Sequence, residues 1–194
     1  MTGERVLVTG GAGLIGSYLA RSLVADGADV VVADDLSGGH RDRVPDGATL
    51  VETDLTSADG VARAVTDGLD RVYHLAAEPA VNADDRRAQV KANTQMTYDL
   101  LERMAAVGVD SLVFTSSSTV YGEAPLPTPE DYAPLEPISV YGASKHGQQP
   151  LLPVYAHSHG FTVWHQRLAN ILGPRRQPEP VIPHFAANHL QDPE

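Results

Sequence analysis

Tyr141 and Lys145 are the residues of this sequence whose types and spacing point most directly to chemistry. Side chains four residues apart lie on one face of a helix, one turn from each other. An ammonium group beside a phenol lowers the pKa of the phenol from its reference value of about 10 towards neutrality. A phenol with such a pKa can take the proton of a sugar or alcohol hydroxyl while hydride leaves the carbon. The pair therefore predicts an acid–base tyrosine assisted by a lysine.

A glycine-rich segment lies near the start of the chain, between an apolar run and a helical pattern. Gly10, Gly13 and Gly16 are spaced by three in this segment. In such a loop the first glycine allows a tight turn, the second lets the backbone approach a pyrophosphate, and the third permits close packing of helix on strand. The N-terminus of the helix then faces the phosphates with free N–H groups. The structural alternative is an ordinary tight turn between strand and helix.

An acidic residue stands where the second apolar run ends. Asp34 at this position can accept hydrogen bonds from the ribose hydroxyls of adenosine, and its charge repels a 2′-phosphate, so NAD is favoured over NADP. Asp35 is the neighbour that can share this role. Arg41 and Arg43 lie close enough in sequence to hold a 2′-phosphate, but we interpret them as solvated loop charges.

The elements that must position these residues alternate between strand and helix. The expected strands cover residues 6–9, 30–33, 50–51, 72–75, 112–114 and 162–168. The expected helices cover 14–25 with Gly27 as a C-terminal cap, 61–65 after Ser57 or Asp59, 89–107 and 141–158. Strands that are almost continuously apolar are buried on both faces, as in parallel sheets. The alternation predicts an α/β fold, a doubly wound parallel sheet with right-handed crossovers.

Length and composition limit the possible classes of protein. A chain of 194 residues suits one domain or slightly more, and prolines after residue 173 mark a boundary. We predict an NAD-binding domain over 1–173 and the start of an incomplete substrate-binding region over 174–194. The absence of a run of about 18 apolar residues and of a signal-peptide layout favours a cytoplasmic protein without a membrane span. The net charge of −11 argues against nucleic-acid binding.

The spacing of two histidines and the scarcity of lysine are two further features of the sequence. His157 and His159 have a spacing that some metal sites use, but no third ligand is evident nearby, so we expect no metal site. Lys91 and Lys145 are the only lysines, whereas aspartate is abundant. Adaptation to high salt and arginine-favouring codon usage both explain this composition.

Taken together, the ordered motifs resemble those of the extended short-chain dehydrogenase/reductases, specifically the NAD-dependent sugar epimerase/dehydratase family. The resemblance covers roughly residues 5–176 and implies a Rossmann-like fold. It is carried by the glycine loop at 9–16, Asp34-Asp35-Leu36, Asp54-Leu55, His74-Leu75-Ala76-Ala77, Asn93, Ser116-Ser117-Ser118-Thr119-Val120-Tyr121-Gly122, Tyr141-Gly142-Ala143-Ser144-Lys145 and residues 167–175.

The resemblance implies a role for each matching position. On the reaction side, Tyr141 is the acid–base, Lys145 binds the nicotinamide ribose and Ser117 hydrogen-bonds the reacting oxygen. Ser117, Ser118 and Asn170 are assigned to the substrate, with Asn170 near its phosphates. The positions assigned to NAD are Gly10, Gly13, Leu14, Ile15, Gly16, Asp34, Asp35, Leu36, Asp54, Leu55, Leu75, Ala76, Ala77, Asn93, Tyr141, Lys145 and Leu168. Read without the family, Asp54 can instead cap the following helix and Asn93 can be a helix-surface residue.

Residues 118 and 119 narrow the expected reaction. Members of the family that eliminate water from a sugar nucleotide usually carry an acidic pair at this place. Ser118 and Thr119 stand here instead, and neither hydroxyl is a competent general acid at neutral pH. We therefore expect 4-epimerisation of a nucleoside-diphosphate sugar, preferably a UDP-sugar, through a transient 4-keto sugar. A dehydratase or reductase of the same family, or a non-catalytic NAD-binding chain, is the alternative.

The sequence departs from the family in two ways. Family members are usually longer, and their C-terminal part builds much of the sugar-nucleotide site. In addition, Pro150 and Pro153 lie in the helix that carries Lys145. An interior proline costs about 3 kcal/mol or more because it removes a hydrogen bond and clashes with the preceding turn. We predict that this helix is kinked or broken near residues 146–150, which puts in doubt the homodimer that the family builds with it.

Overall fold

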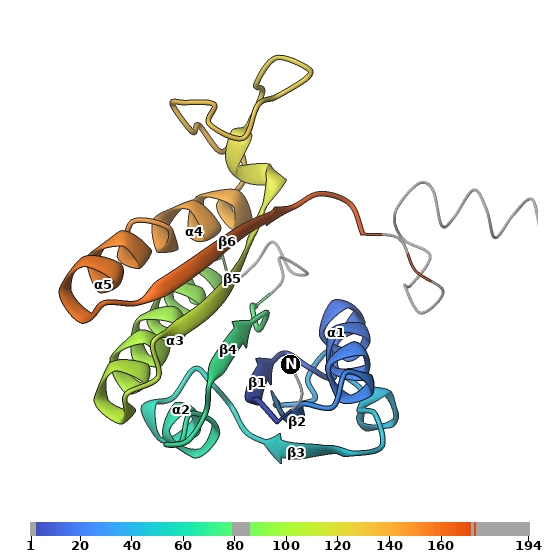
Figure 1. Cartoon of the computed structure of the whole chain (residues 1–194). Coiled ribbons are helices and arrows are strands. Elements are labelled where there is room, and N and C mark those ends of the chain that lie inside the picture. The colour runs from blue at the N-terminus through green and yellow to red at the C-terminus, as the bar shows by residue number, and fades with distance from the viewer. Residues whose placement is uncertain (1–2, 79–85, 172, 174–194) are drawn as a thin grey trace, which may run out of the picture.

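The strands of the computed structural model form one parallel sheet (Figure 1). The structure describes residues 3–78, 86–171 and 173. The strands are β1 (Arg5–Thr9), β2 (Asp29–Asp34), β3 (Ala48–Glu52), β4 (Arg71–His74), β5 (Ser111–Ser117) and β6 (Thr162–Leu168). They lie in the order β3-β2-β1-β4-β5-β6, and each neighbouring pair is parallel. The predicted α/β fold with a Rossmann-like sheet is confirmed.

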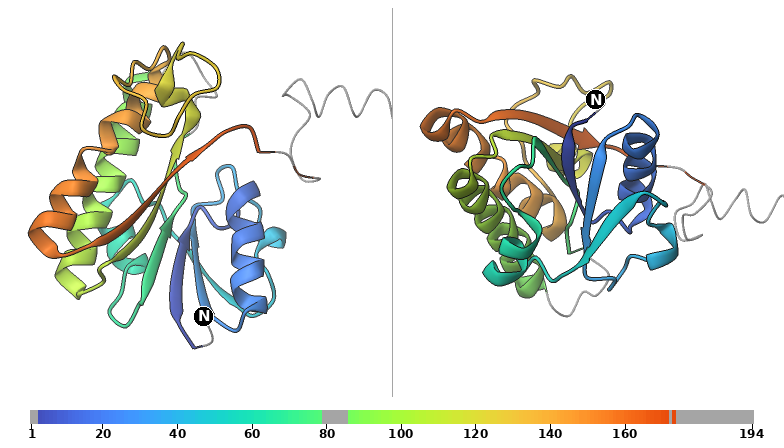
Figure 2. Two further views of the ribbon diagram at one scale, coloured as in Figure 1. Left: turned by 45° about the horizontal axis from the view of Figure 1, so that its top comes forward. Right: turned by 60° about the horizontal axis from the view of Figure 1, so that its bottom comes forward.

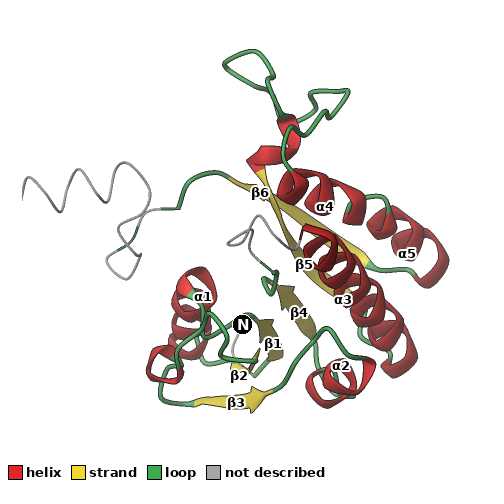
Figure 3. Cartoon of the chain, turned by 180° about the vertical axis from the view of Figure 1, so that it is seen from behind, coloured by secondary structure: helices red, strands yellow, loops and turns green. Residues whose placement is uncertain are grey.

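Helices cover both faces of the sheet (Figure 2). On one face, α1 (Leu14–Ala25) packs against Val6 and Val8. On the other face, α2 (Ala58–Ala64), α3 (Arg86–Val107) and the helix pair α4 (Val140–Gln148) and α5 (Leu151–His159) lie side by side (Figure 3). Leu7 belongs to the core beneath α2 and α3, because successive side chains of a strand point to opposite faces. This double burial explains the continuous apolar run at 6–8.

The ends of α1 and α2 follow from local sequence. Gly27 has a φ of +85°, and the N–H of Ala28 donates to the carbonyl of Leu23 at 3.0 Å. This Schellman arrangement ends α1 at the predicted glycine. Ser57 starts α2, since its hydroxyl oxygen accepts from the N–H of Gly60 at 3.1 Å. Asp54 does not cap this helix; its carboxylate accepts from the N–H of Thr56 instead.

The predicted break in the helix that carries Tyr141 and Lys145 is confirmed. The structure has α4 (Val140–Gln148) followed by α5 (Leu151–His159). Pro150 keeps helical dihedrals, with φ −63° and ψ −20°, so α5 continues close to the direction of α4 (Figure 1). Pro153 is the third residue of α5, where the N–H has no intrahelical partner and proline is tolerated. The homodimer remains a prediction.

The predictions about the C-terminal region and about a membrane span concern residues that the structure describes only in part. Residues 174–194, for which the start of a substrate-binding region was predicted, lie outside the described residues. Among the residues that are described, no helix has both the length and the apolar character needed to cross a membrane.

His159 is one of the two histidines whose spacing was compared with that of metal sites. Its ring stacks on the ring of Tyr155, with centroids 5.3 Å apart.

Candidate active site

Two adjoining cavities lie at the carboxyl ends of the strands. The tyrosine cavity, of about 360 Å³, contains Tyr141, and the aspartate cavity, of about 480 Å³, contains Asp34. Both cavities are lined by Gly10, Gly13 and Leu75, so they form one continuous groove over the glycine loop. Ligands of open α/β sheets bind at this edge, where β1 and β4 leave the sheet in different directions.

Most of the predicted site residues lie on the walls of this groove. The tyrosine cavity is lined by Gly10, Gly13, Leu14, Ile15, Gly16, Leu75, Ala77, Ser117, Tyr141, Lys145, Leu168 and Asn170. The aspartate cavity adds Asp34, Asp35, Asp54, Leu55 and Ala76. Three predicted residues, Leu36, Asn93 and Ser118, lie outside both walls. Leu36 acts on the groove indirectly, because its N–H donates to Asp34 at 2.9 Å. Buried Asn93 hydrogen-bonds the backbone of Glu78 and the hydroxyl of Ser144.

The glycine loop needs its glycines for close contacts. A Cβ atom on Gly10 would lie 2.9 Å from the backbone nitrogen of Ala76, and Gly10 has a φ of +66°. A Cβ atom on Gly16 would lie 2.3 Å from the carbonyl oxygen of Gly10. A Cβ atom on Gly13 would meet only that same oxygen, at 3.2 Å, and Gly13 otherwise faces the groove. The loop is therefore held tightly from behind and open towards a ligand.

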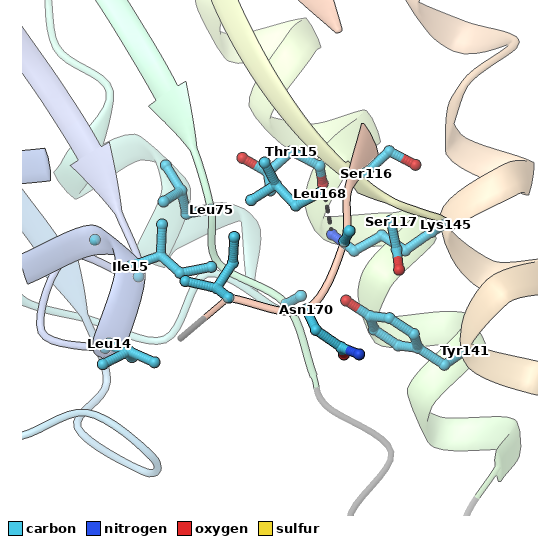
Figure 4. Close-up of a pocket in the computed structure, with 16 residues that line it drawn as sticks. Leu14, Ile15, Leu75, Thr115, Ser116, Ser117, Tyr141, Lys145, Leu168 and Asn170 are labelled. Atoms are coloured by element: carbon cyan, nitrogen blue, oxygen red, sulfur yellow. Dashed lines mark hydrogen bonds between the residues drawn. The ribbon is translucent and has the colours of Figure 1, made fainter. Parts of the chain in front are cut away.

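The first turn of α1 presents unpaired N–H groups to the tyrosine cavity. Gly13 precedes the helix, and Ser17 is the first residue whose N–H reaches back to it, at 3.1 Å. The N–H groups of Leu14, Ile15 and Gly16 therefore have no partner within the helix. All three residues line the cavity, and Leu14 and Ile15 are labelled in Figure 4. Such N–H groups, with the positive end of the helix dipole, fit an anionic pyrophosphate.

Asp34 is held rigidly at the other end of the groove. Its two carboxylate oxygens accept from the N–H of Ala12 at 3.0 Å and from the N–H of Leu36 at 2.9 Å. Each carboxylate oxygen can accept a further hydrogen bond, so Asp34 can still receive ribose hydroxyls. Arg41 forms an ion pair with Glu52. This pairing supports the interpretation of Arg41 as a surface charge rather than a phosphate ligand.

Tyr141, Lys145 and Ser117 converge in the tyrosine cavity (Figure 4). Tyr141 and Lys145 come from α4, and Ser117 is the last residue of β5. The hydroxyl of Tyr141 points towards the side on which Ser117 and Lys145 lie. Lys145 is only 2% exposed, and its Nζ atom donates to the carbonyl oxygen of Thr115 at 3.0 Å. The expected helical spacing thus brings Tyr141 and Lys145 together, and the end of β5 adds Ser117.

The expected lowering of the tyrosine pKa is not found, and this corrects the prediction from sequence. Burial raises the pKa of Tyr141 above its ordinary value. The ammonium of Lys145 hydrogen-bonds the carbonyl of Thr115, and burial lowers the pKa of Lys145 itself to about 8. Spacing in sequence put both residues on one helical face, but the burial of each side chain decides the direction of both pKa shifts.

Ser117 is oriented by Thr119. The hydroxyl oxygen of Ser117 accepts from the hydroxyl of Thr119 at 2.9 Å and from its N–H at 3.2 Å. A serine hydroxyl has two acceptor sites and one proton to donate. Because Thr119 uses the acceptor sites, the proton of Ser117 is available to an oxygen in the tyrosine cavity.

Several residues of the groove were missed from sequence. The carbonyl of Thr115 acts through its backbone, which no side-chain motif reveals. Ala169 and Ile171 line the tyrosine cavity between and beside predicted residues. Ser37, Gly38 and Gly39 line the aspartate cavity, and this run of small residues directly after Leu36 is a signal that was available.

The buried ammonium of Lys145 predicts a pH dependence of stability. The folded protein loses this proton near pH 8, whereas the unfolded chain keeps it up to about 10.5. The unfolded state therefore binds more protons in this window, and stability rises with pH. Above pH 10 the raised pKa values of Tyr141 and Tyr155 act in the opposite direction. From pH 8 to 10 we expect a gain of roughly 2–3 kcal/mol from Lys145.

Urea unfolding of the wild type and of Lys145→Met at pH 7, 8, 9 and 10 measures this contribution. The free energy of unfolding of the variant should lack the rise seen in the wild type. If the free energies of unfolding of the two proteins rise equally with pH, Lys145 is not the source of the rise.

The chain is similar in sequence to known proteins. UDP-glucose 4-epimerase of Azospirillum brasilense is 38% identical over 174 residues, which cover 87% of this chain and 49% of the relative. dTDP-glucose 4,6-dehydratase of Streptomyces griseus is 37% identical over 195 residues, covering 93% of this chain and 58% of the relative. The chain thus spans about half the length of these curated relatives.

A solved structure is similar to this chain as well. Thermus thermophilus UDP-glucose 4-epimerase, in complex with NAD, has a TM-score of 0.84 and 37% identity, with 94% of this chain and 60% of that chain covered. The model of the family described as NAD dependent epimerase/dehydratase matches residues 6–194. This description agrees with the predicted cofactor. On these grounds the chain belongs to the NAD-dependent epimerase/dehydratase family.

Proposed function

We propose that this chain binds NAD along the groove and takes part in 4-epimerisation of a nucleoside-diphosphate sugar, preferably a UDP-sugar. The observation that carries the proposal is the convergence of Tyr141, Ser117 and Lys145 in the tyrosine cavity, at one end of a groove that reaches Asp34. The cavity joins an acid–base group, a hydroxyl donor and an ammonium, which are the groups needed to move the proton of a sugar hydroxyl while bound NAD would take and return the hydride.

The residues present fit NAD. The free N–H groups at the start of α1 fit its pyrophosphate, and Asp34 fits the adenosine ribose. Asp54 and Leu55, in the wall of the aspartate cavity, would flank the adenine. Lys145 and the segment at Leu168 would lie beside the nicotinamide and its ribose. When bound, NAD supplies a hydride acceptor and the positive charge of its oxidised ring.

The residues of the chain supply the proton chemistry. Burial alone keeps Tyr141 a neutral phenol, so its phenolate would have to be favoured by the positive charges of Lys145 and of the oxidised ring of bound NAD. As that phenolate, Tyr141 would take the proton of the C4 hydroxyl as the sugar is oxidised and give it back after the 4-keto sugar has turned over. Ser117, whose acceptor sites are used by Thr119, would donate its hydrogen bond to the reacting oxygen. Asn170, on the rim of the same cavity, would lie near the substrate phosphates.

The composition of the tyrosine cavity favours epimerisation over dehydration. Of the described residues that line it, only Tyr141 and Lys145 are titratable, and none is Asp or Glu. Elimination of water across C5 and C6 needs a general acid and a general base at those carbons. Ser118 lies outside the cavity wall, and the hydroxyl of Thr119 is engaged with Ser117. The similarity to a dehydratase nevertheless makes dehydration the second candidate.

Calorimetric titration of NAD and UDP, followed by product analysis with UDP- and dTDP-sugars, tests the proposal. We expect NAD to bind, and UDP-glucose and UDP-galactose to interconvert without release of NADH. Formation of a 4-keto-6-deoxy sugar without an epimer would identify a dehydratase. Binding of NAD without UDP would leave an NAD-binding chain that needs further residues for its substrate. A chain that does not bind NAD would refute the proposal.

A further inference from the structure

A chain of buried polar side chains runs beneath the groove. Thr9 of β1, His74 of β4, Thr97 of α3 and Gln148 of α4 are each at most 1% exposed. None of the four lines either cavity. The Nδ1 atom of His74 lies 2.8 Å from the hydroxyl of Thr9, and its Nε2 atom lies 3.1 Å from the hydroxyl of Thr97. The hydroxyl of Thr97 reaches Oε1 of Gln148 at 2.7 Å.

The donor and the acceptor of each hydrogen bond between these four side chains follow from Gln148, the residue on α4. The amide nitrogen of Gln148 donates to the carbonyl of Ser144 at 2.8 Å, so the Oε1 atom of Gln148 must face Thr97 and accept its proton. The oxygen of Thr97 then accepts from Nε2–H of His74. Nδ1 is left as an acceptor for the hydroxyl of Thr9. His74 is therefore the neutral Nε2–H tautomer, in agreement with burial, which together with the charge of Lys145 lowers its pKa to about 3.

Each end of the chain reaches backbone that shapes the groove. The hydroxyl oxygen of Thr9 accepts the N–H groups of Leu75 and Ala76, both at 3.1 Å, and these two residues form part of the groove wall. At the other end, the bond from Gln148 to Ser144 lies within α4, and the hydroxyl of Ser144 donates to the carbonyl of Tyr141 at 2.8 Å. The chain thus spans from the wall beside the glycine loop to the helical turn that carries the acid–base tyrosine.

We propose that the chain Thr9–His74–Thr97–Gln148 positions α4 relative to the wall at Leu75 and Ala76, so that His74 and Thr97 are positioning residues for NAD and for Tyr141. The catalytic part of this inference rests on the proposed function; the structural part does not. A buried polar chain with one satisfied arrangement specifies one geometry, because each alternative leaves a donor or acceptor unpaired. Apolar packing between α3, α4 and the sheet has no such directional requirement.

Thr97→Val tests the chain at its centre, since valine keeps the shape of threonine and removes the hydroxyl. Thr97→Ser restores the hydroxyl, and Thr94→Val makes the same change one turn earlier on α3, outside the chain. We expect Thr97→Val to weaken NAD binding about tenfold, the effect of one lost orienting hydrogen bond, whereas Thr97→Ser stays within about twofold of the wild type. Amide exchange should become faster at 75–77 and 141–145 in Thr97→Val and remain unchanged in Thr94→Val.

A second measurement keeps the inference independent of NAD. Nitrogen-edited NMR of the wild-type histidine rings, with His74 assigned by its loss in His74→Asn, should show a neutral ring protonated at Nε2 at pH 7. A ring protonated at Nδ1, or charged at this pH, would contradict the hydrogen-bond directions and so overturn the inference. Unchanged exchange at both segments in Thr97→Val would also overturn it, even if the variant is less stable. Failure of the wild type to bind NAD would refute the proposed function while these two arms still decide the inference.

Discussion

Replacement of Tyr141 by phenylalanine is expected to lower epimerase turnover about 10²- to 10⁴-fold, the usual contribution of a positioned acid–base group. Among the described residues that line the tyrosine cavity, Tyr141 alone carries a phenol; the change removes this hydroxyl and keeps the ring. Ser117 donates a hydrogen bond but cannot hold the proton of the sugar at neutral pH, so it does not replace the tyrosine. The affinity for NAD should change by less than about threefold, since the loss is confined to the transition state.

Turnover of UDP-glucose and calorimetric NAD affinity, measured on the same preparations, separate these two effects. Tyr98→Phe is the matched control, because Tyr98 lies on α3, is 44% exposed and is outside both cavities. A Tyr141→Phe variant that retains wild-type turnover would remove Tyr141 from the mechanism. A variant that loses NAD affinity in proportion to turnover would make the tyrosine a binding residue instead.

Replacement of Gly16 by alanine is expected to reduce NAD affinity at least about 100-fold and to lower stability by about 1–3 kcal/mol, the usual cost of overpacking. The new Cβ atom would lie 2.3 Å from the carbonyl oxygen of Gly10 and 2.7 Å from the Cα atom of Gly11. Both neighbours are backbone, so α1 and the glycine loop must move apart. That movement withdraws the N–H groups of the first helical turn from the position of the pyrophosphate.

Gly147→Ala is the control, and its expected effect on stability has the opposite sign. Gly147 lies on the exposed side of α4, and nothing lies within 4 Å of its added Cβ atom. Alanine there should raise stability by up to about 1 kcal/mol through helix propensity and leave NAD affinity unchanged. Thermal unfolding and calorimetry of the two variants measure both quantities. Normal NAD binding by Gly16→Ala would show that the loop tolerates a side chain at this position.

Much of the fold could be predicted because it depends on local pattern. The apolar runs, the glycine loop and the cap at Gly27 are read over a few residues, and each occurs where it was expected. Pro150 likewise predicted the break between α4 and α5, since the loss of its N–H is a property of the residue itself. Element boundaries shifted by a few residues where tertiary hydrogen bonds extend a strand, as at β5.

In the site, too, some features could be predicted from local sequence and others are decided by tertiary contacts. Spacing along the chain was sufficient to place Tyr141 and Lys145 on one face of a helix, and the ordered motifs were sufficient to identify the family. Burial and partners distant in sequence were decided only in the tertiary structure. Lys145 meets a carbonyl thirty residues away, and Thr9 meets His74 across sixty-five residues. Such contacts depend on which strands end side by side. The same tertiary packing buries Tyr141, which raises its pKa, and buries His74, which keeps that ring neutral.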